Sequence, residues 1–129
     1  MHRSLPVLLF LACPAAADVP VSAAEFEAFA TGKTLTYSLG GAVYGAEQYL
    51  PGRRVIWAFK DQQCRKGFWY EEAGQVCFLY EDDPAAQCWT FRRDGSGLRA
   101  QFSGDPEGAE PSQVQESAPL TCAGPDLGV

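Results

Sequence analysis

Adjacent carboxylates are the residues in this chain best suited to acid–base catalysis. Glu71 adjoins Glu72, and Glu81 precedes Asp82 and Asp83. Two carboxylates can supply the acid and the nucleophile of a glycosidase, but they need a cleft that perturbs their pKa values. Both clusters fall in segments expected to be hairpin turns, where acidic side chains are solvated. We therefore expect no catalytic residue and no enzymatic activity.

Composition argues against several other kinds of chemistry. The one histidine, His2, lies in the segment that we expect to be removed, so the mature chain would lack a Ser-His-Asp triad and histidine-bound metal. The cysteines form no C-x-x-C motif, and no acidic stretch has the spacing of a calcium loop. A net charge of −6 disfavours nucleic acid. We expect no metal and no cofactor.

Residues 1–17 have the order of a secretory signal peptide. Arg3 precedes an apolar run at 5–11, and small residues then lead to an expected cleavage between Ala17 and Asp18. An alternative interpretation makes Cys13 the lipidated first residue of a lipoprotein. The apolar run is shorter than the roughly 20 residues of a membrane span. We expect a periplasmic or secreted protein without a transmembrane segment.

Four cysteines remain after the signal peptide: Cys64, Cys77, Cys88 and Cys122. An even number in a small exported chain is typical of disulfides, and four cysteines allow three pairings. The strand pattern selects among them. If Ala73-Gly74 forms a tight turn, Trp69 faces Phe78, and an antiparallel return places Cys77 opposite Cys88. This register predicts a Cys77–Cys88 disulfide and, by elimination, Cys64–Cys122.

The remaining sequence predicts one mainly β domain over residues 18–129. Ser22 and Glu25 form a capping-box pattern for a short N-terminal α-helix at 22–31. Residues 34–102 alternate with period two and form an antiparallel meander. We expect a small lipocalin-like barrel or strongly curved sheet of about seven to eight strands. Residues 103–129 are expected to be an acidic loop and tail.

Several short motifs resemble a group of small exported proteobacterial proteins that share a domain of unknown function, DUF995-like. They are Gly67-Phe68-Trp69, Cys77-Phe78, Cys88-Trp89-Thr90-Phe91, Gly32-Lys33-Thr34-Leu35 and Tyr49-Leu50-Pro51-Gly52. The resemblance covers roughly Thr31 to Phe91 and implies export and pairing of Cys77 with Cys88. It implies no activity. The chain departs from the group in Cys64, Cys122 and the acidic tail.

Aromatic side chains on the inward positions give the first functional hypothesis. A barrel of about eight strands lies between a filled and a hollow interior, so both outcomes stay open from sequence. A hollow barrel would bind a small apolar or amphipathic ligand. The residues expected to touch it are Trp57, Trp69, Phe78, Trp89 and Phe91.

A second hypothesis belongs to a different class of function. The acidic tail would suit a secreted inhibitor or docking partner of a cationic envelope protein, because opposite charges speed association. Its contact residues would be Asp105, Glu107, Glu110 and Glu116. A structural envelope protein without a ligand is a third possibility. Three basic doublets, at 53–54, 65–66 and 92–93, are interpreted as surface positions of strands.

Overall fold

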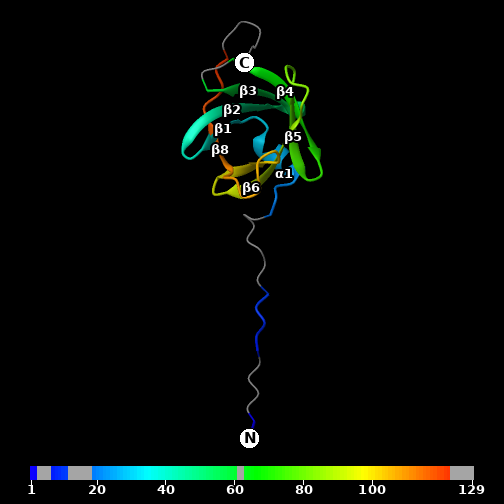
Figure 1. Ribbon diagram of the computed structural model, residues 1–129, viewed down its shortest axis with the longest axis vertical. Coiled ribbons are helices and arrows are strands. Elements are labelled where there is room, and N and C mark those ends of the chain that lie inside the picture. The colour runs from blue at the N-terminus through cyan, green and yellow to red at the C-terminus, as the bar shows by residue number, and fades with distance from the viewer. Residues whose placement is uncertain (3–6, 12–18, 61–62, 123–129) are drawn as a thin grey trace.

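The computed structural model describes residues 1–2, 7–11, 19–60 and 63–122. Within them, eight antiparallel strands form a closed barrel in sequence order, with the last strand pairing with the first (Figure 1). This confirms the expected mainly β fold with a short helix. The strands are β1 (Thr34–Leu39), β2 (Ala42–Leu50), β3 (Arg54–Phe59), β4 (Arg65–Glu72), β5 (Gln75–Tyr80), β6 (Gln87–Asp94), β7 (Gly97–Phe102) and β8 (Ser112–Ser117).

The helix α1 (Ala23–Ala30) begins at the predicted capping box. The Ser22 hydroxyl accepts from the Glu25 amide at 3.1 Å, and the Glu25 carboxylate accepts from the Ser22 amide at 3.4 Å. These bonds satisfy amides that a helix start leaves free. The helix is too short to be stable alone, so packing must stabilise it.

One end of the barrel is filled by α1. Phe26 is 0% exposed, and its ring centroid lies 5.5 Å from that of Tyr49, 5.2 Å from Trp69 and 4.6 Å from Phe91. Ion pairs from Glu25 to Arg93 and from Glu27 to Arg53 fasten the outer side of the helix. The helix therefore closes this end, which we call the helix end.

The register between β4, β5 and β6 is the predicted one. Trp69 pairs with Phe78, and Cys77 pairs with Cys88. The connecting turn has positive φ angles of 49° at Ala73 and 77° at Gly74, the backbone of a tight hairpin turn. Alternation then directs the aromatic side chains at 69, 78, 80, 89 and 91 into the barrel, whereas Phe68 on β4 is 46% exposed.

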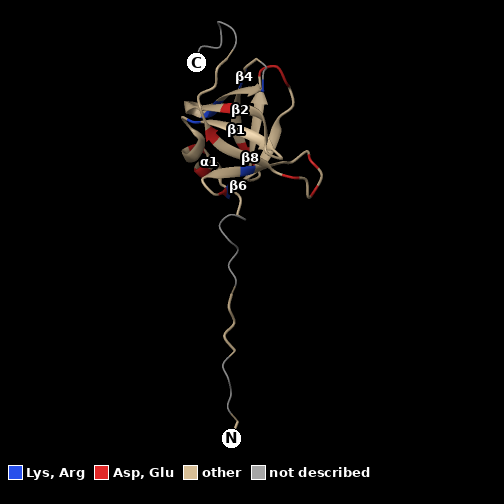
Figure 2. Ribbon diagram, turned by 90° about the vertical axis from the view of Figure 1, so that its left-hand side faces the viewer, with Lys and Arg blue, Asp and Glu red and all other residues tan. Residues whose placement is uncertain are grey.

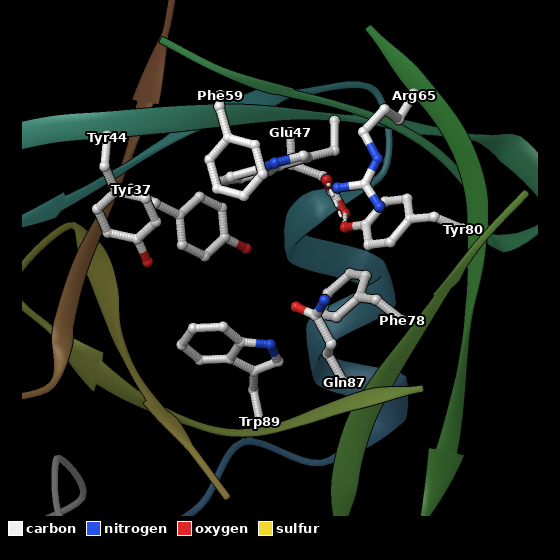
Figure 3. A pocket seen from close by; sticks show the side chains of 10 residues that line it. Tyr37, Tyr44, Glu47, Phe59, Arg65, Phe78, Tyr80, Gln87 and Trp89 are labelled. Carbon is white, nitrogen blue, oxygen red and sulfur yellow. Dashed lines mark hydrogen bonds between the residues drawn. The ribbon is translucent and has the colours of Figure 1, made fainter. Parts of the chain in front are cut away.

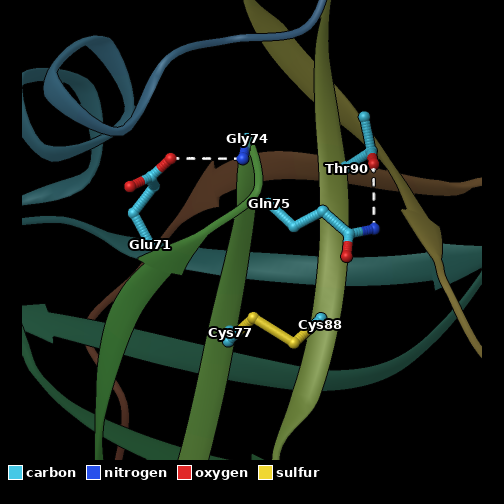
Figure 4. Close-up of a disulfide and its surroundings, with 6 residues drawn as sticks. All are labelled: Glu71, Gly74, Gln75, Cys77, Cys88 and Thr90. Atoms are coloured by element: carbon cyan, nitrogen blue, oxygen red, sulfur yellow. Dashed lines mark hydrogen bonds between the residues drawn. A yellow bond between two sulfur atoms is a disulfide. The ribbon is translucent and has the colours of Figure 1, made fainter.

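Two disulfides join the expected cysteine pairs, one predicted from the strand register and the other by elimination. Cys77 and Cys88 bridge neighbouring strands, with their sulfur atoms 2.08 Å apart (Figure 4). Cys64 and Cys122 are joined at 2.00 Å, beside Ile56 on the outer face of β3. Two disulfides are consistent with an oxidising compartment.

The region after residue 102 differs from the expectation. Residues 103–129 were expected to be a loop and tail, but Ser112–Ser117 forms β8 and pairs with both β7 and β1. Val114 is fully buried, and the small Ser112 fits inside the wall. The pairing of β8 with β1 and β7 closes the barrel through main-chain hydrogen bonds, which require few apolar side chains. Residues 103–111 form a loop before β8, and the described residues 118–122 after it contain no helix or strand.

The expected signal peptide lies largely beyond what the structure describes. Residues 7–11 are exposed and contain no helix or strand. Cys13 and the expected cleavage site between Ala17 and Asp18 lie outside the described residues. In residues 1–2, 7–11, 19–60 and 63–122, no helix is long and apolar enough to cross a membrane.

The strand connections divide between the two ends of the barrel. In an antiparallel meander successive turns alternate ends, so residues 51–53, 73–74 and 95–96 lie at the helix end. The connections at 40–41, 81–86 and 103–111 lie at the opposite end, together with the described residues 60 and 63–64 between β3 and β4. Figure 2 shows acidic loops projecting on the side away from α1. We call this opposite end the cavity end because residues near it, among them Tyr44 and Phe59, line a cavity.

Candidate functional site

A cavity of about 70 Å³ lies in the barrel toward the cavity end (Figure 3). Seven aromatic residues line it: Tyr37, Tyr44, Trp57, Phe59, Phe78, Tyr80 and Trp89. The three other lining residues are polar or charged: Glu47, Arg65 and Gln87. Small-molecule sites in proteins usually enclose about 300 to 1,000 Å³. The cavity therefore admits a very small ligand or one end of a larger one.

A buried carboxylate is the most unusual feature of this cavity. Glu47 is 1% exposed because β2 alternation turns it inward between Gly45 and Tyr49. The Tyr80 hydroxyl donates to its carboxylate and lies 2.9 Å from each oxygen. Burial raises the pKa of Glu47 to about 8, although the Tyr80 hydrogen bond and the Arg65 charge oppose the rise. At neutral pH the carboxyl group mostly holds its proton.

Arg65 connects the cavity to the loops around it. Its Nε lies 2.9 Å from both carboxylate oxygens of Asp82, and Nη2 lies 2.8 Å from Oδ1. The guanidinium also lies over the Tyr80 ring, 4.9 Å from its centroid. Its side chain is 22% exposed. Arg65 is therefore partly shielded and already paired with a carboxylate.

The cavity tyrosines stay neutral. Tyr37 and Tyr49 share a short hydroxyl–hydroxyl hydrogen bond, and burial raises both pKa values well above the usual range. Tyr44 bonds the Ser112 hydroxyl at 2.6 Å, and burial raises its pKa too. Burial and the nearby Glu47 raise the pKa of Tyr80. Glu47 is thus the lining group whose pKa lies nearest neutrality.

Two glycines let large rings lie against the barrel wall. A Cβ on Gly45 would lie 2.3 Å from Trp57 Cζ2, and one on Gly67 would lie 2.8 Å from Tyr80 Cδ1. Such distances are far below ordinary contact, so the rings occupy space that only glycine leaves. Gly45 and Gly67 therefore set the position of the Trp57 indole and the Tyr80 phenol.

The five aromatic residues expected to touch a ligand separate into two groups. Trp57, Phe78 and Trp89 line the cavity. Trp69 and Phe91 pack against Phe26 at the helix end instead. Period-two alternation identified the inward face correctly, but it carries no information on depth along the barrel axis. The helix occupies the end to which Trp69 and Phe91 belong.

Sequence reasoning missed the polar part of the cavity. Glu47 was not singled out, and Arg65 was interpreted as a surface residue. The available signal was the alternation itself, since Glu47 has the same parity as Tyr49 on β2 and pairs with Trp57 in the β2–β3 register. A charged residue on the inward face of a β-strand marks a candidate site.

The carboxylate pairs considered first do not form a site. Glu71 accepts from the Gly74 amide at 3.1 Å within its own turn (Figure 4), and Glu72 is exposed. Asp82 is held by Arg65, whose hydrogen bond lowers its pKa. Among the described residues, Glu72 lies near two cysteine sulfurs, but these belong to a disulfide and are not free to bind metal.

The residues expected to contact a cationic partner are exposed but lie on two elements. Asp105, Glu107 and Glu110 belong to the loop at 103–111, which projects from the barrel beside β8 (Figure 2). Glu116 lies on β8 itself. Three of the four carboxylates therefore lie on one loop, where Asp105 and Glu107 line a shallow surface hollow with Thr90 and Arg92 of β6.

The arrangement can bind a small molecule through rings, one ionisable carboxyl group and several hydrogen-bonding groups. Comparison with known proteins adds no further constraint on this interpretation. No protein-family model, no curated protein and no solved structure matches the chain.

Proposed function

We propose that this is a non-catalytic periplasmic protein that binds a small amphipathic ligand at the cavity end of its barrel. The observation that carries the proposal is the cavity itself. It combines aromatic walls with Glu47, a buried carboxyl group that costs stability unless it has partners. A filled barrel core would not need such a group, since replacing it by an apolar residue would avoid its desolvation.

The polar groups at the cavity support binding of an amphipathic rather than a purely apolar ligand. The Gln87 amide and the Trp89 indole lie at its edge (Figure 3). Neither side chain makes a hydrogen bond to another residue in the described part of the chain. A ligand with one polar end would satisfy these groups and place its apolar part against the rings.

Ligand titrations with matched tryptophan variants test the proposal. Protein purified from its host is analysed by native mass spectrometry, and tryptophan fluorescence is followed against a panel of small amphipathic compounds. Trp57→Phe and Trp89→Phe should reduce the fluorescence response, because both indoles line the cavity. Trp69→Phe is the control, since Trp69 lies at the helix end. Absence of any adduct and of any response would refute the proposal.

A second candidate function rests on the projecting loop. Asp105, Glu107 and Glu110 are exposed there, as an inhibitor or docking partner of a cationic envelope protein would require. A pull-down from envelope extract should then recover a basic protein at low salt and lose it at high salt. Recovery that is unchanged after neutralising these three carboxylates and Glu116 would refute this candidate.

A further inference from the structure

The charges inside the cavity indicate which class of ligand it favours. Glu47 supplies a buried carboxyl group. Arg65, the basic residue among the cavity lining, already donates to Asp82. An incoming anion would compete with Asp82 for Arg65 and would lie close to Glu47. A cation would instead gain a carboxylate partner in a site shielded from water, where electrostatic attraction is stronger than in bulk water.

The aromatic walls favour the same class. Electron-rich ring faces attract ammonium groups, and the attraction is stronger where the contact is shielded from water. The rings of Tyr37 on β1, Trp57 on β3 and Trp89 on β6 all line the cavity. Trp57 and Tyr37 lie 5.4 Å apart between centroids. An ammonium ion in this space would have aromatic contacts on several sides.

Two acidic loops leave the barrel at the cavity end. The loops at 81–86 and 103–111 carry six described carboxylates: Glu81, Asp82, Asp83, Asp105, Glu107 and Glu110. The described basic residues nearest this end are Lys60, which follows β3, and Arg65 and Lys66, which begin β4. The carboxylates outnumber the basic groups, and the acidic loops project away from α1 (Figure 2). A negative rim concentrates small cations at an entrance and speeds their capture.

The cavity volume limits the size of the group that enters. The 70 Å³ of the cavity is small beside the roughly 300 to 1,000 Å³ of most small-molecule sites. The group that enters must therefore be compact, and a trimethylammonium group, with one nitrogen and three methyl carbons, is a compact cation. A longer substituent would extend toward the loops.

We propose that the cavity binds a small organic ammonium ion, with Glu47 as its counter-ion and the surrounding aromatic rings as its cage. This inference rests on the proposed binding function and names its ligand class. An ammonium ion beside ionised Glu47 gives the cavity the same net charge as protonated Glu47 alone. Binding therefore releases one proton and leaves no uncompensated charge in the barrel.

Glu47 is the group whose charge should change with pH, because the described groups that face it keep one charge state. Tyr37 on β1, Tyr49 on β2 and Tyr80 on β5 have raised pKa values and stay neutral. Arg65 on β4 stays charged, and Trp57 on β3 and Gln87 on β6 do not titrate. The acidic residues of α1, Glu25 and Glu27, pair with Arg93 and Arg53 at the helix end. Affinity for an ammonium ion should therefore rise with pH.

Three ligands of nearly equal shape test the inference by isothermal titration calorimetry. They are choline, its uncharged carbon analogue 3,3-dimethylbutanol, and the anion 3,3-dimethylbutanoate. Choline should bind at least about tenfold more tightly than the alcohol, which corresponds to about 1.4 kcal/mol. Glu47→Gln should greatly reduce that difference, leaving the part due to the aromatic rings, and the matched exposed variant Glu116→Gln should keep it in full. Raising the pH from about 6 to about 8 should tighten choline binding by about tenfold or more.

The outcomes separate this inference from the function on which it rests. Equal affinity for choline and the alcohol, or tighter binding of the anion, would overturn the ammonium assignment and leave small-ligand binding intact. Choline binding that Glu47→Gln leaves unchanged would overturn the role of Glu47. If no probe binds and native mass spectrometry detects no adduct from the host, both proposals fail.

Discussion

Ionisation of Glu47 should make the stability of this barrel fall as pH rises. The pKa of the buried group is about 8 in the folded chain, against an ordinary value of 4.5. Between those values the folded state holds a proton that the unfolded state has lost. The contribution of Glu47 to folding stability is therefore greatest near or below pH 4.5. It is lost as the pH rises through the pKa of the folded state.

The size of the effect follows from proton linkage. Each pH unit inside the window removes about 1.4 kcal/mol, so the change from about pH 5 to about pH 7.5 amounts to about 3 kcal/mol. That is a large share of the roughly 5 to 15 kcal/mol that stabilises most domains. Glu25 and Asp82 act in the opposite direction, since their lowered pKa values make stability fall only under acidic conditions.

Urea unfolding at several pH values measures this slope directly. Wild type, Glu47→Gln and Glu116→Gln are compared with their disulfides intact, from about pH 5 to about pH 7.5. Glu47→Gln should lose most of the decrease, because glutamine stays neutral throughout. Glu116→Gln removes a carboxylate from the exposed face of β8 and should behave as wild type. Equal slopes in wild type and Glu47→Gln would refute the assignment of a raised pKa to this group.

Three further predictions concern the fold and the walls of the cavity. Phe26→Ala should cost about 3 to 5 kcal/mol in urea unfolding, because it leaves a void among Tyr49, Trp69 and Phe91 at the helix end. Gly45→Ala should displace the Trp57 indole. It should therefore weaken choline binding in calorimetry and shift tryptophan emission. An unaltered emission spectrum would argue against displacement of the indole. Replacing Cys64 and Cys122 by serine opens a loop of 58 residues, and replacing Cys77 and Cys88 opens one of 11. Chain entropy predicts losses of about 4 and about 3 kcal/mol, respectively. Thermal unfolding measures both losses, and a larger loss for the Cys77–Cys88 pair would contradict the prediction.

The central strands were predictable because two independent patterns agreed on one register. Alternation placed Trp69 and Phe78 on one face, and the same register brought Cys77 opposite Cys88. The closing strand β8 was not predictable in this way. Its main contribution is main-chain pairing with β1 and β7, and Val114 is its one large apolar side chain. Composition therefore made it resemble the loop that precedes it.

The candidate site was less predictable than the fold because it depends on depth and on exceptions to the pattern. Trp57 and Trp69 both point inward, yet only the position of α1 decides that one lines a cavity and the other packs against Phe26. Glu47 breaks the rule that inward positions are apolar. Its role becomes visible once the closed barrel places Tyr80 from β5 beside it.

The same proton connects the stability of the barrel to its proposed ligand. A ligand that binds only the folded state adds stability in proportion to the logarithm of its concentration over its dissociation constant. An ammonium ion should bind ionised Glu47 preferentially, so the stabilisation by a fixed choline concentration should increase with pH, where the free protein is weakest. In Glu47→Gln the increase should vanish, whereas Glu116→Gln should retain it. A thermal shift that is independent of pH in wild type would mean that the ligand does not replace the Glu47 proton.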